Sequence, residues 1–209
     1  MNTDENGLVV DKVHVWRGDR HVLKGVSAQA APGDLVHVLG PNGTGKTTLL
    51  RVITGLLLPE QGRVTWRDQD IGRFRTEYLA QLVYLSHEPA LKGDLTALEN
   101  LKFSVGLKRR VSAEELGEHL SRTGIAQCAH LPARILSAGQ RRRVAMARVL
   151  AMRASLWLLD EPYTNLDVQG SKLVSELLLA HVREGGLAVV VAHHELQIER
   201  PLRRLELSA

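Results

Sequence analysis

The chain has 209 residues and a formal net charge of +4, and 44% of its residues are hydrophobic, 24% charged and 4% aromatic. This composition is ordinary for a globular protein and suffices for one core of aliphatic side chains, with room for a small subdomain. The single cysteine, Cys128, excludes an internal disulfide, and no apolar run approaches the roughly 20 residues that span a bilayer.

The N-terminus and the charge distribution restrict the choice of partners. The first residues, MNTDENG, are polar and acidic, so we expect no signal peptide. A mild basic excess suits a phosphate ligand, a nucleic acid or an anionic membrane surface. Because the basic clusters at Lys108–Arg110, Arg141–Arg143 and Arg203–Arg204 are short, we expect no nucleic-acid partner, and membrane contact only through other proteins.

Strand patterns prevail in the first part of the chain. Short alternating or apolar segments bounded by turn residues predict strands at Leu8–Trp16, Val22–Ala30, Leu35–Leu39, Arg63–Trp66 and Leu82–Leu85. The segment Thr44–Thr54 predicts a helix that ends near Gly55. We expect the N-terminal strands to form an antiparallel portion.

From about Thr96 to Met152 the pattern is mostly helical, and we expect residues 88–152 to form an inserted helical subdomain of a single domain spanning residues 1–209. Ser112 and Glu115 have the spacing of a capping box, which predicts a helix start. Gly139–Arg153 has apolar positions at helical spacing among basic ones, so it predicts an amphipathic helix with a charged face.

The last part of the chain returns to alternating strands and helices. We expect a strand, a helix, a strand and a short alternating stretch at Leu156–Leu159, Val168–Arg183, Leu187–Ala192 and Arg203–Leu207. Strands as apolar as LWLL and LAVVVA are typical of a parallel sheet buried on both faces. The element order therefore predicts an α/β protein with a mostly parallel core sheet.

Residues 40–47, GPNGTGKT, match the pattern G-x-x-x-x-G-K-[ST] and lie between a predicted strand and a predicted helix. Glycines let the backbone approach phosphate oxygens, and the N–H groups of the loop and helix N-terminus attract an anion. Lys46 is expected to reach the β- and γ-phosphates and Thr47 to bind Mg²⁺. The predicted nucleotide contacts are Gly40, Pro41, Asn42, Gly43, Thr44, Gly45, Lys46, Thr47 and Thr48.

Two acids follow the apolar run Leu156–Leu159. A buried strand that ends in acid places charge at the carboxyl edge of the sheet, where α/β proteins hold their ligands. Asp160 is expected to hold Mg²⁺ through water, and Glu161 to orient or deprotonate an attacking water. The alternative interpretation, a solvated loop with two acids, does not account for the phosphate loop earlier in the chain.

The segment Leu136–Gln140, LSAGQ, precedes a helix rich in arginine. Ser137 and Gly139 near a helix N-terminus offer hydroxyl and backbone donors to an anion, which predicts a second phosphate-binding cap. One chain has no obvious use for two caps on one nucleotide, and a plain N-cap loop is the alternative interpretation.

LSAGQ resembles the LSGGQ signature of ABC ATPases, with Ala138 in place of the third residue. In that family the signature of one subunit closes over the nucleotide held by the other, so that two subunits enclose two ATP molecules. The resemblance implies a P-loop NTPase of the ABC-ATPase type that acts as an ATP-sandwich homodimer. It also implies that Ser137, Gly139 and Gln140 bind nucleotide across the dimer interface.

The other elements of the family follow in order along the chain. Asn165-Leu166-Asp167 resembles the family's D-loop, which implies that Asp167 contributes to nucleotide binding. His193 follows the strand Leu187–Ala192, where the family's switch histidine touches the γ-phosphate, and His194 is the adjacent alternative. The resemblance thus implies that Lys46, Glu161 and His193 are the catalytic residues.

Two positions depart from the family pattern. Glu88 is assigned the place of the family's glutamine after the strand Leu82–Leu85, where a carboxylate is able to bind the metal ion. Arg17, beside Trp16, stands where many relatives have an aromatic residue that stacks on adenine. A guanidinium plane also stacks on a base, so Arg17 is expected to contact the nucleotide, and ATP over GTP is left open.

Among ABC ATPases, the chain is most similar to the ATP-binding subunits of the bacterial haem exporter complex of cytochrome c maturation. The residues that support this are YLSHEP (84–89), LTALENL (95–101), LSAGQRRR (136–143) and WLLDEPYT (157–164), and the resemblance covers essentially the whole chain. It implies an integral membrane permease as partner. It also implies a peripheral location on the cytoplasmic face of the bacterial inner membrane and hydrolysis linked to haem release or translocation.

Three alternatives remain open from the sequence. The first is the ATPase of another small exporter, for drugs, lipids or polysaccharide. The second is a non-transport ABC protein of DNA repair or translation, although such proteins usually carry long insertions or two ATPase halves. The third is a P-loop kinase or GTPase, which would have no use for LSAGQ.

Overall fold

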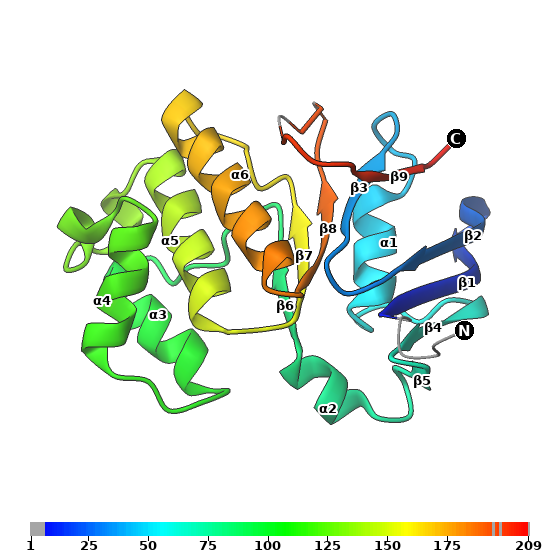
Figure 1. The fold of residues 1–209 in the computed structure, drawn as a ribbon, viewed down its shortest axis with the longest axis horizontal. Coiled ribbons are helices and arrows are strands. Elements are labelled where there is room, and N and C mark those ends of the chain that lie inside the picture. The colour runs from blue at the N-terminus through cyan, green and yellow to red at the C-terminus, as the bar shows by residue number, and fades with distance from the viewer. Residues whose placement is uncertain (1–6, 194, 197, 209) are drawn as a thin grey trace.

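The computed structural model describes residues 7–208 except 194 and 197. A parallel sheet lies in the middle of the molecule, between an antiparallel sheet on one side and a group of helices on the other (Figure 1).

The central sheet has the strand order β6-β7-β8-β3-β9, and all neighbouring strands are parallel. Its strands are β3 (Leu35–Leu39), β6 (Leu82–Leu85), β7 (Leu156–Asp160), β8 (Leu187–Val191) and β9 (Arg203–Glu206). Every residue of β7 and β8 is buried, because helices cover both faces of the sheet. The predicted parallel core sheet is confirmed.

The second sheet is antiparallel and has the order β2-β1-β4-β5. Its strands are β1 (Leu8–Arg17), β2 (Arg20–Ala30), β4 (Gln61–Trp66) and β5 (Gln69–Asp70). Alternate residues along β1 are buried, as expected for strands with one face on the core. This sheet confirms the expected antiparallel portion.

The short helix α1 (Lys46–Ile53) lies between the two sheets and joins their cores (Figure 1). Leu49 and Leu50 on α1 are fully buried in one cluster with Val13 of the antiparallel sheet and Val189 of the parallel sheet. This packing fixes the start of α1 against the carboxyl edge of the parallel strands. The helix α2 (Arg75–Ala80) then leads into β6.

The opposite face of the parallel sheet is covered by α6 (Val168–Arg183) and by one side of α5 (Ala138–Ala151). Val174 and Leu178 of α6, with Val149 of α5, pack against buried strand residues in a second core cluster. The two helices therefore cover β7 and β8 from this side.

The helices α3 (Ala97–Gly106), α4 (Ala113–Arg122) and α5 share a third core, with the short 3-10 segments η2 (Ala126–Cys128) and η3 (Ala133–Ile135) beside it. Helix α5 has one side in this core and the other against the sheet, so it connects the two parts. An inserted helical part is present, and its expected boundary at about 88–152 stays a prediction.

Ser112 caps α4 by accepting a hydrogen bond of 3.2 Å from the N–H of Glu115, which confirms the predicted helix start. The reciprocal half of the capping box does not form, because the Glu115 carboxylate binds Arg109 and Arg153 instead. Complete capping boxes begin α3, at Thr96, and α5, at Ser137.

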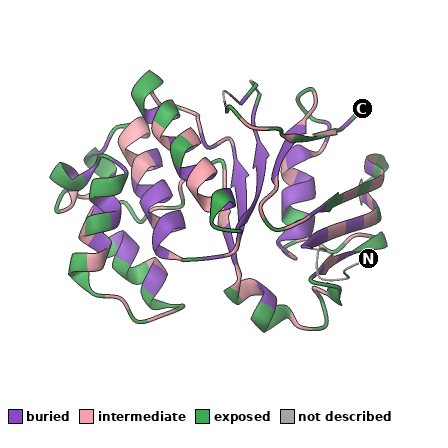
Figure 2. Cartoon of the chain, in the orientation of Figure 1, coloured by how far each residue is buried: buried purple, intermediate pink, exposed green. Residues whose placement is uncertain are grey.

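Buried residues concentrate in the parallel strands and on the inner faces of the helices, as Figure 2 shows. Within the described part of the chain, no helix combines the length and apolar character needed to cross a membrane.

Candidate functional site

The phosphate loop connects β3 to α1 and has a backbone that glycine alone adopts easily. Gly40, Gly43 and Gly45 have φ angles of 146°, 82° and 97°. A Cβ on Gly40 would lie 2.5 Å from the carbonyl oxygen of Leu207, so the loop also requires glycine for space. Since Gly45 is left-handed, α1 begins at Lys46, two residues later than predicted.

Lys46 is held over this loop by the loop's own carbonyl groups. Its Nζ donates to the oxygens of Gly40 at 2.6 Å and Pro41 at 3.0 Å, and the residue is 7% exposed. The ammonium group and the N-terminus of α1 therefore supply positive charge at one place. That arrangement suits a polyphosphate.

Thr47 and Asp160, which are 113 positions apart in the chain, meet at the carboxyl edge of the parallel sheet. The Thr47 hydroxyl donates to Asp160 Oδ2 at 2.8 Å, and Asp160, the last residue of β7, is 1% exposed. This pair presents two hard oxygen donors at one point. Mg²⁺ prefers such ligands, so these residues fit the metal ion predicted from the sequence.

Glu161 lies one residue beyond β7 in a left-handed conformation, with a φ of 54°. His193 Nε2 is 3.2 Å from Glu161 Oε1, close enough for an ion pair but not aligned for a hydrogen bond. Among the described residues, this buried oxygen has no hydrogen-bond partner. Burial raises the pKa of Glu161, and the nearby His193 opposes that effect. A carboxylate oxygen that lacks a partner is suited to accept a proton from water.

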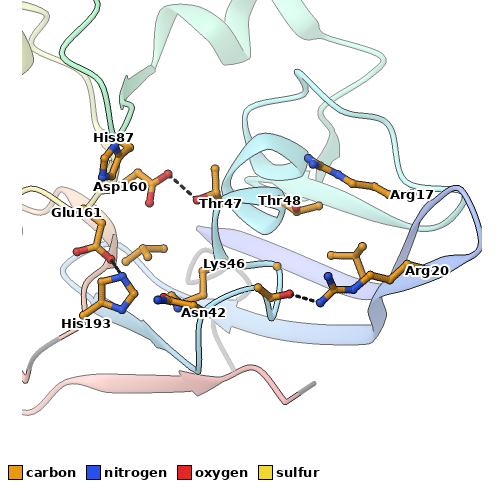
Figure 3. Close-up of a pocket in the computed structure, with 14 residues that line it drawn as sticks. Arg17, Arg20, Asn42, Lys46, Thr47, Thr48, His87, Asp160, Glu161 and His193 are labelled. Atoms are coloured by element: carbon orange, nitrogen blue, oxygen red, sulfur yellow. Dashed lines mark hydrogen bonds and ion pairs between the residues drawn. The ribbon is translucent and has the colours of Figure 1, made fainter.

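These residues line one cavity of about 340 Å³, drawn in Figure 3. Its walls come from the β1–β2 hairpin, the phosphate loop, and the ends of β6, β7 and β8. The predicted residues that line it are Arg17, Asn42, Gly43, Gly45, Lys46, Thr47, Thr48, Asp160, Glu161 and His193. Gly40, Pro41 and Thr44 shape the loop behind it. The alternative residue His194 lies outside the described residues.

The hairpin side of the cavity is basic. Arg17 and Arg20 both line it, and Arg20 Nη2 donates to the carbonyl oxygen of Gly43 at 2.8 Å (Figure 3). Trp16 is not among the lining residues, and its ring stacks on His21 at 3.9 Å between ring centroids. Arg17, and not the neighbouring tryptophan, is therefore available to a nucleotide base.

His87 lines the cavity, whereas the predicted metal ligand Glu88 is exposed and does not. The strand register explains this, because Leu85 pairs with Leu159 in the parallel sheet. Two residues further on, His87 lies level with Glu161, and Figure 3 shows it beside Asp160. Sequence reasoning missed His87, and counting two positions beyond the end of the strand could have found it.

The segment Ser137–Gln140 begins α5, away from this cavity. Ser137 Oγ accepts from the Gln140 N–H at 3.2 Å, and Gln140 Oε1 accepts from the Ser137 N–H at 2.8 Å. A Cβ on Gly139 would lie 2.6 Å from the carbonyl oxygen of Asn165, so this turn packs tightly on the loop before α6. None of the predicted signature residues lines the cavity of its own chain.

Asp167 caps α6 and lies outside the cavity as well. It accepts from the Gly170 N–H at 2.7 Å and forms an ion pair with Arg143 Nη2 at 2.9 Å. The Gly170 N–H lowers the pKa of Asp167, and Arg143 adds to the effect. Its predicted contact with nucleotide is not made within one chain.

Residues 23–164 match the family model of ABC transporters. The chain belongs to the ABC transporter family. It resembles the cytochrome c biogenesis ATP-binding export protein CcmA of Methylococcus capsulatus, with 46% identity over 96% of this chain and 98% of the relative. The CcmA protein of Nitrosococcus oceani is 45% identical, over 97% of this chain and 92% of the relative.

Solved ABC cassettes have the same fold. A dimeric ATP-binding cassette bound to ADP and Pi in a post-hydrolysis state has a TM-score of 0.79 and 28% identity, over 90% of this chain and 88% of that one. A bacterial Atm1-family ABC exporter with ATP bound has a TM-score of 0.82 and 24% identity, over 92% of this chain and 35% of that one. This confirms the predicted ABC-ATPase fold.

Family membership identifies the chain as an ATP-binding, ATP-hydrolysing transporter subunit of the cytochrome c biogenesis export type. It excludes the kinase and GTPase alternatives. The roles of individual residues of the ABC site remain predictions, now with a geometry that constrains them.

Proposed function

We propose that this ABC ATPase drives a cytochrome c biogenesis exporter and couples ATP hydrolysis to the release or translocation of haem. One observation supports the catalytic part: Lys46, Asp160 and Glu161 meet at one cavity although the chain separates the lysine from the acids. Similarity to CcmA proteins along nearly the whole chain supports the export system.

The phosphates of ATP bind in the loop, against its backbone N–H groups and Lys46. Each hydrogen bond that involves a charged group contributes about 1.5–3 kcal/mol. The base lies toward the hairpin, where the Arg17 guanidinium stacks on it. Stacking contacts the face of a base and not the edges that distinguish adenine from guanine. This contact therefore gives weak selectivity between the two bases.

Thr47 and Asp160 hold Mg²⁺ in this proposal. Their side-chain oxygens would serve as the hard ligands that this ion prefers. Mg²⁺ held there would neutralise negative charge that develops on the phosphates during the reaction. Thr47 and Asp160 orient the ion by keeping their own hydrogen-bonded arrangement at the end of β7.

Glu161 accepts a proton from the attacking water, whose oxygen bonds to the γ-phosphorus as the bond to the β–γ bridging oxygen breaks. The Glu161 carboxylate, whose buried Oε1 lacks a hydrogen-bond partner among the described residues, receives the proton. His193 holds this carboxylate from one side at 3.2 Å and faces the γ-phosphate. ADP and phosphate are the products.

The signature turn completes the site from a second copy of the chain. Ser137 and Gly139 lie outside their own cavity, so they reach a nucleotide only across a dimer interface. The dimeric cassettes with related folds support this arrangement. We place the homodimer against an integral permease on the cytoplasmic face of the bacterial inner membrane.

The first test is Glu161→Gln, compared with Glu176→Gln, a change on the exposed part of α6. The glutamine variant should bind ATP, hydrolyse it at least about 100-fold more slowly, and accumulate as a dimer. Gel filtration with ATP and a phosphate-release assay check this. Monomers with normal hydrolysis would refute the sandwich mechanism.

The second test concerns the cargo. The full chain should copurify from membranes with a permease of the haem-handling type. Recovery of a permease for drugs, lipids or polysaccharide would instead support the rival exporter. Binding to DNA-repair or ribosomal components would support a non-transport ABC protein.

A further inference from the structure

One buried arginine connects the nucleotide cavity with the helix that carries the signature turn. Arg142 lies in the second turn of α5, and it is 2% exposed. Burying a guanidinium is costly unless hydrogen bonds and opposite charges compensate it. The groups around the Arg142 guanidinium therefore indicate its role.

The Arg142 guanidinium donates hydrogen bonds to the backbone of the loop after β6. Nη1 donates to the carbonyl oxygen of Ser86 at 3.0 Å, and Nη2 donates to that of His87 at 2.6 Å. The acids Asp160 and Glu161 lie close enough to favour its charged form, although burial lowers the pKa of Arg142. Two carbonyl groups thus accept hydrogen bonds from this buried charge, while its Nε has no hydrogen-bond partner among the described residues.

The two ends of this connection face different nucleotides in the proposed dimer. His87, whose carbonyl Arg142 holds, lines the cavity of its own chain. Ser137 caps the same helix that carries Arg142, about 7.5 Å away along the helix axis at about 1.5 Å per residue. One helix thus carries both Ser137 and Arg142, and the planar fork of Arg142 ties that helix to the two loop carbonyl groups.

We propose that Arg142 is a positioning residue that couples the two nucleotide sites of the dimer. When the signature turn closes on the partner's nucleotide, α5 shifts, and Arg142 carries that shift to the loop with His87 in its own cavity. The proposal rests on the sandwich dimer of the proposed function. It adds a path within each chain by which one site senses occupation of the other.

A purely structural role is the competing explanation. In that case Arg142 would only satisfy two loop carbonyl groups and balance two acids, and its loss would lower stability without changing how the sites communicate. The two roles differ in one measurable property, the cooperativity of hydrolysis with respect to ATP. Stability alone does not separate them.

The experiment compares Arg142→Met, Arg142→Lys and a matched control, Arg148→Met, in the full-length chain. Arg148 lies on the same helix, is half-buried, and has no side-chain hydrogen bond or ion pair with any described residue. For each variant we would measure the affinity for a non-hydrolysable ATP analogue, the ATP dependence of hydrolysis, and Tm.

Arg142→Met should keep analogue affinity within about twofold, lose between about tenfold and 100-fold in kcat, and reduce the Hill coefficient to 1. Arg142→Lys, which keeps the charge but not the fork, should recover part of the cooperativity. Arg148→Met should match the wild type in cooperativity. If Arg142→Met does not fold, Arg142→Lys and Arg142→Gln supply the same comparison.

An unchanged Hill coefficient in a folded Arg142→Met dimer would overturn the inference, as would non-cooperative hydrolysis by a wild-type dimer. Either result leaves the proposed function intact, provided that Glu161→Gln still forms the ATP-dependent dimer. Failure of that dimer to form would refute the proposed function itself, so the two failures are distinguishable.

Discussion

The nucleotide cavity and the signature turn, which we propose both bind phosphate, differ in what their polar groups do. In the cavity, Glu161 keeps an oxygen without a hydrogen-bond partner among the described residues. At the turn, Ser137 and Gln140 satisfy each other in a capping box. The cavity therefore keeps an acceptor that is unpaired in the described part of the chain, whereas the polar groups of Ser137 and Gln140 are paired with each other. Substitutions that damage one region and spare the other should separate binding from turnover.

The largest effect is expected for Lys46→Ala, which removes the cation from the cavity. Because its ammonium makes charge-assisted contacts with phosphate, affinity for ATP should fall roughly 100-fold, and hydrolysis should be lost. Titration calorimetry with ATP measures the affinity. Lys172→Ala, on the exposed face of α6, is the control, and an equal loss there would point to unfolding.

Ser137→Arg should impair the signature turn and leave the nucleotide cavity unchanged. A long charged side chain at the turn blocks closure on the partner, so hydrolysis should fall at least about 100-fold while ATP binding to the monomer stays unchanged. Paired binding and turnover assays test it against Ser121→Arg on the exposed surface of α4. Weaker binding to the monomer would contradict the role across the interface.

The smallest effect is expected for Glu115→Gln, which loosens the helical part without touching the cavity. Hydrogen bonds from Arg109, with the charges of Arg109 and Arg153, lower the pKa of Glu115 from 4.5 to about 2. A depressed carboxyl pKa stabilises the fold above the unfolded value, and this stabilisation is lost as pH falls from about 4.5 toward 2. The variant should melt slightly lower at pH 7.

Thermal melts at pH 7 and at pH 2–4 measure this effect. The difference in Tm between wild type and Glu115→Gln should shrink as the pH falls. Glu118→Gln, on the same helix and without an ion pair to any described residue, should show no such trend. A difference in Tm that stays constant with pH would mean that the ion pairs do not stabilise α4.

Several parts of the fold could be predicted because their signals are local. The apolar segments at Leu156–Leu159 and Leu187–Ala192 form β7 and β8 with nearly the expected bounds. The prediction for Ser112 and Glu115 was half right, since two distant arginines compete successfully for the carboxylate. The local spacing predicted the Ser112 cap but not the two arginines that bind the Glu115 carboxylate.

The sequence by itself determined the phosphate loop and the acid pair. The loop depends on glycines that adopt positive φ angles, and of the two acids Asp160 ends an apolar strand and Glu161 follows it. Only the tertiary structure decided that His87, and not Glu88, faces the cavity, and that Arg142 holds its carbonyl group. These facts depend on the register between β6 and β7 and on how α5 packs. Strand register and helix packing join residues that are far apart in the chain, so neither can be predicted from a local sequence pattern.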